Sequence, residues 1–339
     1  MHLQRKYFLK FTNFISYSSF YKVANFFVLI FSHILANIGI QLTRKRMPFF
    51  ISVEILNYCN LHCPECPVGK NEIIAAKRQN FDIHLYRTLI NQLKPTLGHV
   101  ILYFQGEPFL NNNLSEFIQI AHQAKIYTST STNGQFLNSN NVNQIVSSGL
   151  DKIIVSIDGA TQEVYETYRV GGNLNKAIQG IKELVAAKKL LKSMTPLIEI
   201  QFLVLKTNEH QMDEMKRLAK SLNVDKLTFK TAQLSDFEDG NDLMPTKNKY
   251  SRYKKSKDGK FRLKGKQPNR CWRMWSGAVV NVNGEVLPCC FDKKSENSFG
   301  NIKENSFAEC WHSKKGSDFR EKIFQNRKQF EMCRNCTSG

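Results

Sequence analysis

The sequence predicts an α/β fold built on a parallel sheet with crossover helices. Six apolar runs of strand length alternate with amphipathic stretches of helical length, which is typical of βαβ units. The expected strands cover residues 51–56, 99–104, 126–131, 152–157, 198–205 and 226–230. The expected helices lie between them, near residues 82–93, 114–123, 138–147, 174–190 and 209–221. In a parallel barrel, open or closed, the catalytic and binding residues lie at the C-terminal ends of the strands.

Residues 1–47 form an expected helical segment ahead of the sheet. The twenty-one residues between Lys22 and Arg44 carry no charge, and as a helix of about 31 Å they are long enough to cross a bilayer. Basic residues flank the run on both sides, so no positive-inside asymmetry favours a span. Polar side chains fall on one half of this helix and apolar ones on the other. The polar half holds Asn25, His33, Asn37 and Gln41, and the apolar half holds Phe27, Phe31, Ile34, Leu35, Ile38 and Leu42.

This pattern predicts an interfacial helix that lies on a membrane. Packing against the protein's own barrel and a true span are the alternatives. Met47-Pro48 then marks the boundary with the next domain.

The 339 residues carry a net charge of +19, and two segments hold nearly all of it. Residues 1–50 contain seven basic side chains and no acidic one, and residues 245–273 contain twelve basic and one acidic. Such blocks indicate nucleic acid or anionic lipid as a neighbour, with solvated lysines as the alternative. Residues 236–270 are therefore expected to be a basic linker. Nucleic acid is not expected as a partner, because aromatic residues are too sparse among the lysines to form a stacking platform.

Nine cysteines are too few for a disulfide scaffold, and no secretory signal with a cleavage site is evident. A reducing cytoplasm is the expected location, with the inner face of the membrane as a candidate surface.

Cys59, Cys63 and Cys66 follow the first expected strand and so fall at the mouth of the barrel. Three thiolates can hold three irons of an iron–sulfur cluster and leave one iron open. A structural zinc site is the alternative, but it needs a fourth ligand and His62 is badly spaced to provide it.

The run Cys-Asn-Leu-His-Cys-Pro-Glu-Cys resembles the signature of radical S-adenosylmethionine (SAM) enzymes. This resemblance implies a partial (β/α)6 TIM-like barrel over residues 48–235. It also implies a [4Fe–4S] cluster with an open site on Cys59, Cys63 and Cys66, where SAM binds. Later strand ends carry further motifs in the family's order: Gly106-Glu107-Pro108, Ser131-Thr132-Asn133-Gly134, Ser156-Ile157-Asp158-Gly159 and then Arg169.

The resemblance gives these motifs roles toward SAM. Gly106 and Glu107 would bind its amino group, Ser131 and Asn133 would reach its methionine part, and Arg169 would hold its carboxylate. Ser156 and Asp158 resemble the segment that contacts the ribose. On spacing alone, the glycine motifs are equally turn signals, and Arg169 is equally a solvated arginine at a helix end. The position before the third cysteine is often aromatic in the family and is Glu65 here, which leaves the adenine contacts unassigned.

A second cysteine group lies in residues 271–339. Cys271, Cys289, Cys333 and Cys336 resemble the SPASM auxiliary-cluster domain in its shortened twitch form, which implies one auxiliary [4Fe–4S] cluster. A hairpin with Asn283-Gly284 as its turn is expected before Cys289. A four-cysteine zinc site is the alternative. The adjacent Cys290 leaves the choice of ligand open, and Cys310 is expected to be a buried small residue.

Together these features predict a radical SAM oxidoreductase that forms a 5′-deoxyadenosyl radical. The expected reaction is dehydrogenation of an alcohol in a sugar, aminosugar or polyol, with a phosphorylated or lipid-linked substrate in view of the basic segments. Modification of a ribosomal peptide or protein is the alternative, and a zinc-stabilised basic binding protein is a distant one. Expected partners are the small or glycan-type substrate, an external electron donor such as flavodoxin or ferredoxin, and an anionic membrane surface. No catalytic acid or base is assigned.

Overall fold

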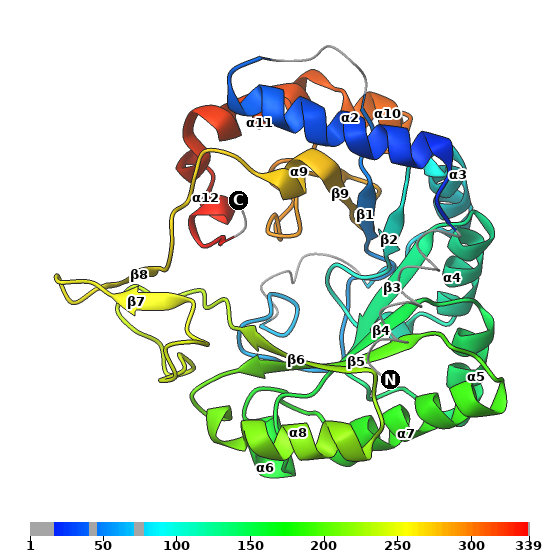
Figure 1. Ribbon diagram of the computed structural model, residues 1–339, viewed down its shortest axis with the longest axis vertical. Coiled ribbons are helices and arrows are strands. Elements are labelled where there is room, and N and C mark those ends of the chain that lie inside the picture. Colours follow the sequence, from blue (N-terminus) through cyan, green and yellow to red (C-terminus); the bar gives the residue numbers. More distant parts are fainter. Residues whose placement is uncertain (1–16, 41–45, 71–77, 338–339) are drawn as a thin grey trace.

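A curved eight-stranded sheet forms the centre of the protein, for which the computed structural model describes residues 17–40, 46–70 and 78–337 (Figure 1). The strand order is β10-β9-β1-β2-β3-β4-β5-β6, parallel from β9 to β6, and β10 is antiparallel to β9. The strands are β1 Phe50–Val53, β2 His99–Ile101, β3 Tyr127–Thr132, β4 Lys152–Ser156, β5 Leu197–Val204, β6 Lys226–Thr231, β9 Gly277–Val280 and β10 Val286–Leu287.

Helices cover the outer face of this sheet (Figure 1). They are α3 Ile83–Leu93, α4 Leu114–Gln123, α5 Ser139–Ser147, α7 Leu174–Leu190 and α8 Met212–Ser221, with a short α6 at Gln162–Glu166. The side chains of Asp82, Asn138 and Asn173 accept hydrogen bonds from the first turns of α3, α5 and α7, which fixes where these helices begin. The predicted alternation of six strands and five helices is confirmed.

The main core lies between the sheet and these helices. Ile51, Val100, Ile153 and Ile200 lie on four parallel strands and are fully buried. Strands buried on both faces are near-continuous apolar runs, which is why they were visible in the sequence.

The C-terminal residues extend the same sheet. Strand β9 pairs in parallel with β1, and Phe50 lies opposite Gly277. A Cβ on Gly277 would lie 2.2 Å from the Phe50 ring, so only glycine allows this approach. The predicted hairpin is confirmed, with Gly284 at φ +88° in its turn. Four helices complete the region: α9 Trp272–Ser276, α10 Phe307–Trp311, α11 Lys314–Asn326 and α12 Glu331–Arg334.

The expected basic linker contains a hairpin of its own. Strands β7 (Tyr253–Lys255) and β8 (Phe261–Leu263) form a separate antiparallel pair that projects from the body (Figure 1). Most of its lysines are exposed, so the positive charge of this segment faces solvent.

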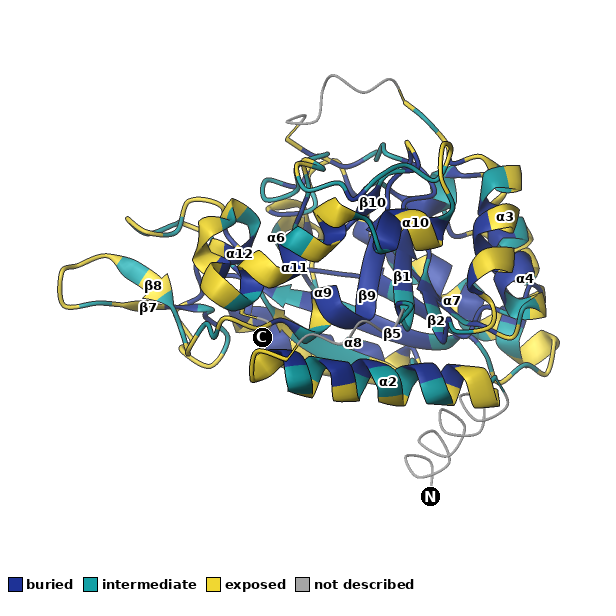
Figure 2. Ribbon diagram, turned by 90° about the horizontal axis from the view of Figure 1, so that it is seen from above, coloured by how far each residue is buried: buried dark blue, intermediate teal, exposed yellow. Residues whose placement is uncertain are grey.

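Helix α2 (Phe20–Asn37) runs along one edge of the molecule beside the C-terminal helices (Figures 1 and 2). It is long and apolar enough to cross a membrane by length and composition, and 22% of it is buried inside the protein. The helix packs on α9 of the C-terminal region. The sequence alternative expected packing against the barrel, which Lys22 reaches at the Lys125 carbonyl before β3. Gln41, Leu42, Arg44 and Lys45 lie outside the described residues.

Candidate active site

The three cysteines of the first motif line one cavity at the C-terminal ends of the strands. Its volume is about 150 Å³. Six of the seven residues predicted to contact SAM also line it: Gly106, Glu107, Ser131, Asn133, Ser156 and Arg169. Residues that are more than 100 positions apart in the sequence, such as Cys59 and Arg169, therefore meet at the C-terminal ends of the strands, as predicted.

Hydrogen bonds hold the cysteine loop in shape. Leu61 N–H donates to Cys59 Sγ over 3.4 Å, and Cys66 N–H donates to the Cys63 carbonyl over 3.1 Å. Asn133 Nδ2 donates to Asn60 Oδ1 over 2.8 Å and lies 3.7 Å from Cys59 Sγ, which ties the loop to the end of β3. A Cβ on residue 69 would lie 2.6 Å from the Cys63 backbone, so Gly69 is needed where the loop closes.

Glu107 joins two strand ends inside this site. Its carboxylate accepts from Thr132 Oγ1 and Asn133 N–H, both over 2.7 Å, and from Phe109 N–H over 3.1 Å. Burial raises the pKa of Glu107, although these hydrogen bonds oppose the shift. The preceding Gly106 has φ +76°, and a Cβ there would lie 2.7 Å from the Tyr58 carbonyl. This segment therefore positions the cysteine loop as well as lining the cavity.

Arg169 is the cation of the site. Its Nε donates to Asp158 Oδ2 over 2.5 Å, and its Nη1 lies 3.7 Å from Cys63 Sγ. Burial lowers the pKa of Arg169, but Asp158 and Cys63 outweigh burial and raise the pKa well above its usual value. Only 17% of the Arg169 side chain is exposed and the guanidinium is paired with Asp158, so Arg169 is not the solvated helix-end residue of the alternative.

Asp158 lies behind Arg169 and does not line the cavity. Its second oxygen accepts from Leu203 N–H over 2.6 Å, and its backbone carbonyl accepts from Asn208 Nδ2 over 2.9 Å. Asp158 thus orients Arg169 from the end of β4, and the ribose contact implied by the resemblance stays a prediction.

The second cysteine group lines a separate, small cavity. Cys271, Cys289, Cys333 and Cys336 all border it, and all four are buried. Arg327, itself 1% exposed, lies against the same cavity and opposes the effect of burial on the pKa of Cys271 and Cys333. Burial still raises the pKa of Cys271 and Cys333 overall, and the Arg327 cation favours the thiolate form of these two residues, the form that binds metal.

The remaining two cysteines lie elsewhere. Cys290 is not among the residues that line this cavity; it packs with Phe104 and Leu287, and Arg273 Nη1 donates to its Sγ over 3.0 Å. Cys310 is buried on α10, and its Sγ would lie 3.0 Å from a Cβ on Gly300. Cys289 lines the cavity and Cys290 does not, and the sequence had left the choice between them open.

Comparison with known proteins agrees with this architecture. Residues 53–219 match the family model described as the radical SAM superfamily, and residues 271–337 match the SPASM iron–sulfur cluster-binding domain. The chain belongs to the radical SAM superfamily. It carries a C-terminal SPASM domain, and the family's cofactors are SAM and a [4Fe–4S] cluster, with auxiliary iron–sulfur in the SPASM region.

Two curated relatives resemble the chain over most of both lengths. A PqqA peptide cyclase of Rhizobium meliloti (strain 1021) is 25% identical over 323 residues, which cover 87% of this chain and 81% of the relative. The SAM-dependent 2-deoxy-scyllo-inosamine dehydrogenase of Niallia circulans is 24% identical over 294 residues, which cover 85% and 92%.

Solved structures show the same fold. BtrN in complex with AdoMet and 2-DOIA has a TM-score of 0.54 and 21% identity, with 87% of this chain and 95% of that chain covered. SuiB of Streptococcus suis, bound to SAM, has a TM-score of 0.62 and 14% identity, with 86% and 72% covered.

The residues of this radical SAM enzyme fit the cofactors of the family. Burial raises the pKa of Cys59 to about 12, so its thiolate needs a positive partner such as iron. Three cysteines line the first cavity and four line the second, and thiolate is the usual protein ligand of iron–sulfur clusters.

Sequence reasoning missed Tyr103, Thr132 and Tyr168, which also line the first cavity. Tyr103 follows β2, which ends at Ile101, whereas the expected strand ran to residue 104 and so placed Tyr103 inside it. Burial raises the pKa of Tyr103, so this side chain keeps its proton.

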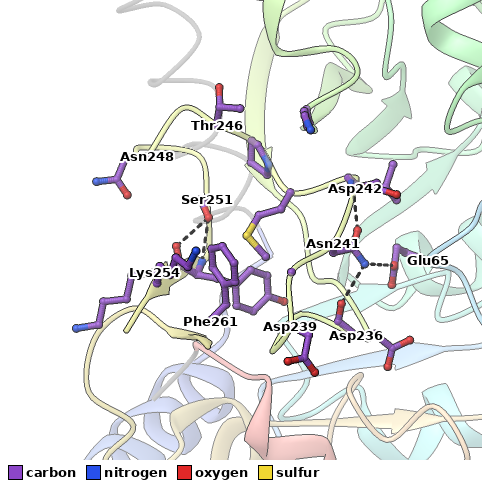
Figure 3. Close-up of a pocket in the computed structure, with 17 residues that line it drawn as sticks. Glu65, Asp236, Asp239, Asn241, Asp242, Thr246, Asn248, Ser251, Lys254 and Phe261 are labelled. Atoms are coloured by element: carbon purple, nitrogen blue, oxygen red, sulfur yellow. Dashed lines mark hydrogen bonds between the residues drawn. The ribbon is translucent and has the colours of Figure 1, made fainter. Parts of the chain in front are cut away.

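Glu65, at the position that is often aromatic in the family, joins the cysteine loop to a distant segment of the chain. The Glu65 carboxylate accepts from Ser235 N–H and Ser235 Oγ, both over 2.8 Å, and from Asn241 Nδ2 over 3.5 Å. It thereby ties the cysteine loop to the segment after β6. Figure 3 shows Asn241 between Glu65 and Asp236 at the wall of a second, open pocket of about 880 Å³. This larger pocket reaches the β7–β8 hairpin and is bordered by Lys254 and Phe261.

Proposed function

We propose that this radical SAM enzyme oxidises an alcohol of a sugar, aminosugar or polyol to a carbonyl. The observation that carries the proposal is the ring of four buried cysteines, Cys271, Cys289, Cys333 and Cys336, around one cavity. Four thiolates satisfy a [4Fe–4S] cluster completely, so no iron is left to bind substrate. A fully ligated cluster suits electron transfer, and an oxidation requires an electron acceptor.

When bound, SAM and the first cluster supply a radical that removes a hydrogen atom from carbon, and the auxiliary cluster supplies an acceptor for one electron. The chain's own residues hold and shield these groups. Arg169 presents a charged guanidinium that suits a carboxylate, and Asp158 fixes its plane. Asn133 and Glu107 fix the cysteine loop against two strand ends. Loss of the hydroxyl proton completes the two-electron oxidation.

The similarity to the dehydrogenase of Niallia circulans over 92% of that protein also favours this proposal.

The test is an anaerobic assay with SAM, a reductant and a series of sugars, aminosugars and polyols deuterated at their alcohol carbons. The proposal expects deuterium in 5′-deoxyadenosine and a product two hydrogens lighter than the substrate. Cys289→Ala should still cleave SAM but lose the oxidised product, whereas Cys310→Ala should retain both activities. An oxidised product that forms equally well in Cys289→Ala would contradict the proposal.

A peptide substrate is the second candidate. It is favoured by the open 880 Å³ pocket, which exceeds the needs of a single sugar, and by the similarity to the PqqA peptide cyclase. The same assay separates the two functions when peptides deuterated at Cα and Cβ are added. Transfer of deuterium from a peptide, with none from any sugar, would replace the first proposal by the second.

A further inference from the structure

Helix α2 is attached to the protein through its polar side. Asn25 forms two hydrogen bonds with the backbone of Met47, which donates to Oδ1 over 3.2 Å and accepts from Nδ2 over 2.9 Å. Ser32 Oγ accepts from Trp275 Nε1 over 2.9 Å. Lys22 is 4% exposed and donates from Nζ to the Lys125 carbonyl. The side of α2 that faces the protein carries these polar side chains together with the buried Leu29 and Ala36, whereas Asn37 stays exposed.

The opposite side of α2 presents large apolar side chains to the exterior. Phe27 is 63% exposed, Phe31 58%, Ile34 55% and Ile38 67%. Phe20 and Tyr21 extend the same exposed set at the start of the helix. We call Phe27, Phe31, Ile34 and Ile38 the apolar face. Contiguous apolar patches of this kind on a protein surface mark contact with another apolar phase. Figure 2 shows exposed positions recurring along the outer side of α2.

The sequence charge of the segment that contains α2 favours one occupant. Residues 1–50 contain seven basic side chains and no acidic one; five of these lie outside the described residues, and Lys22 and Arg46 contact the protein. A segment with this net charge is attracted to an anionic bilayer and repelled by a second copy of itself. A span is disfavoured, because pulling α2 into a membrane would break the bonds of Asn25 and Ser32 and place Lys22 in hydrocarbon.

We propose that the apolar face of α2 docks this enzyme on the surface of an anionic membrane, with the helix lying in the plane of the interface. The apolar side chains enter the boundary between headgroups and acyl chains, and the polar side of the helix stays bonded to the protein. Nothing in this inference depends on the chemical identity of the substrate.

The test measures binding of the full-length, reconstituted enzyme to vesicles by sedimentation. Vesicles of phosphatidylcholine with one quarter phosphatidylglycerol are compared with pure phosphatidylcholine, at about 0.1 M and about 0.5 M salt. We expect binding to the anionic vesicles that weakens several-fold at high salt. The variant Phe27→Ser/Phe31→Ser should bind at least tenfold more weakly, while its iron content stays unchanged.

The matched control is Leu190→Ser/Met194→Ser, which removes two exposed apolar side chains near the end of α7, outside the apolar face. It should bind vesicles like the wild type. Equal loss of binding in both variants, or no binding to anionic vesicles, would overturn the proposal. A wild type that is dimeric in solution and becomes monomeric in Phe27→Ser/Phe31→Ser would also overturn it, in favour of a second copy as the occupant.

Discussion

Arg169 keeps its positive charge in the active-site cavity although burial disfavours the charged form, because Asp158 stabilises it. Its Nε is bonded to Asp158, which leaves the outer nitrogens toward Cys63 and the cavity. Lysine carries a point charge without a planar fork, so it cannot bond Asp158 and a carboxylate ligand in the same plane. Arg169→Lys should therefore weaken SAM binding by about 10-fold to 100-fold, corresponding to about 1.4 to 2.7 kcal/mol.

Equilibrium binding of SAM to the anaerobic, reconstituted protein measures this effect. Arg87→Lys is the control, because Arg87 forms an exposed pair with Glu116 on the outer surface. Iron content should be unchanged in both variants. A loss of iron from Arg169→Lys equal to its loss of SAM binding would mean that the residue supports the cysteine loop and has no direct role toward SAM.

A buried carboxyl at the end of β1 makes stability depend on pH. Burial raises the pKa of Glu54 to about 7. The hydrogen bond that Val282 N–H donates to its carboxylate over 2.9 Å lowers the pKa but does not offset burial. The folded chain keeps this proton up to about pH 7, whereas the unfolded chain releases it near pH 4.5. The free energy of unfolding should therefore fall as pH rises through this window, by on the order of 3 kcal/mol from this group alone.

Glu54→Gln removes the ionisation and keeps a hydrogen-bond acceptor. Relative to wild type it should gain stability from pH 5 to pH 7.5, as measured by denaturant unfolding at each pH. Glu116→Gln, at an exposed position, is the control. A constant difference between wild type and Glu54→Gln across this range would show that Glu54 ionises at an ordinary pH.

At the scale of elements, α2 is held by few but specific contacts. Asn25 bonds the backbone of Met47 twice, whereas Asn37 donates only to His33, one turn earlier on its own helix. Asn25→Ala should loosen the docking of α2 by about 1–2 kcal/mol, because two partly buried backbone groups of Met47 lose their partner. Hydrogen exchange of residues 20–37 should become faster in Asn25→Ala and stay unchanged in Asn37→Ala. Equal exchange in the two variants would contradict this account.

The sequence predicted the repeating elements well, because their signals are local. Strands β1, β4 and β5 are largely apolar in sequence, and amphipathic stretches indicate the helices between strands, although β3 is rich in Ser and Thr. The predicted cavity residues also came together, because strand ends meet at one edge of a parallel sheet. The orientation of α2 could not be predicted. An amphipathic pattern shows that a helix has two sides, and it does not show which side faces the protein.

Other parts of the site depend on tertiary contacts that leave no local pattern. Asp158 lies in the expected motif, yet its carboxylate is used by Arg169 and Leu203 behind the cavity. Glu65 was noted only as a departure, but it holds Ser235, which lies 170 positions later in the chain. The β7–β8 hairpin was hidden in a segment dominated by lysines, where charge obscured short strand patterns.

At the scale of the whole molecule, one continuous sheet joins the two cysteine regions. Strand β9 lies beside β1, and β1 leads directly into the loop of Cys59. The auxiliary region therefore covers an edge of the barrel sheet that would otherwise offer unpaired backbone groups. The two cavities are nevertheless lined by different cysteines, so each cluster should assemble on its own ligands within a shared scaffold.

This arrangement predicts the distribution of iron across the chain. Anaerobic reconstitution should give about eight irons per chain, because each cavity takes a four-iron cluster. Cys59/Cys63/Cys66→Ala and Cys271/Cys333→Ala should each retain about four, and Cys310→Ala should retain about eight. Iron and acid-labile sulfide, measured together, check the count. Zinc without sulfide in the wild type would contradict both cluster sites. Loss of all iron from either cysteine variant would show that the shared sheet makes the two sites interdependent, since disturbing one end of β1 and β9 would then unfold the other.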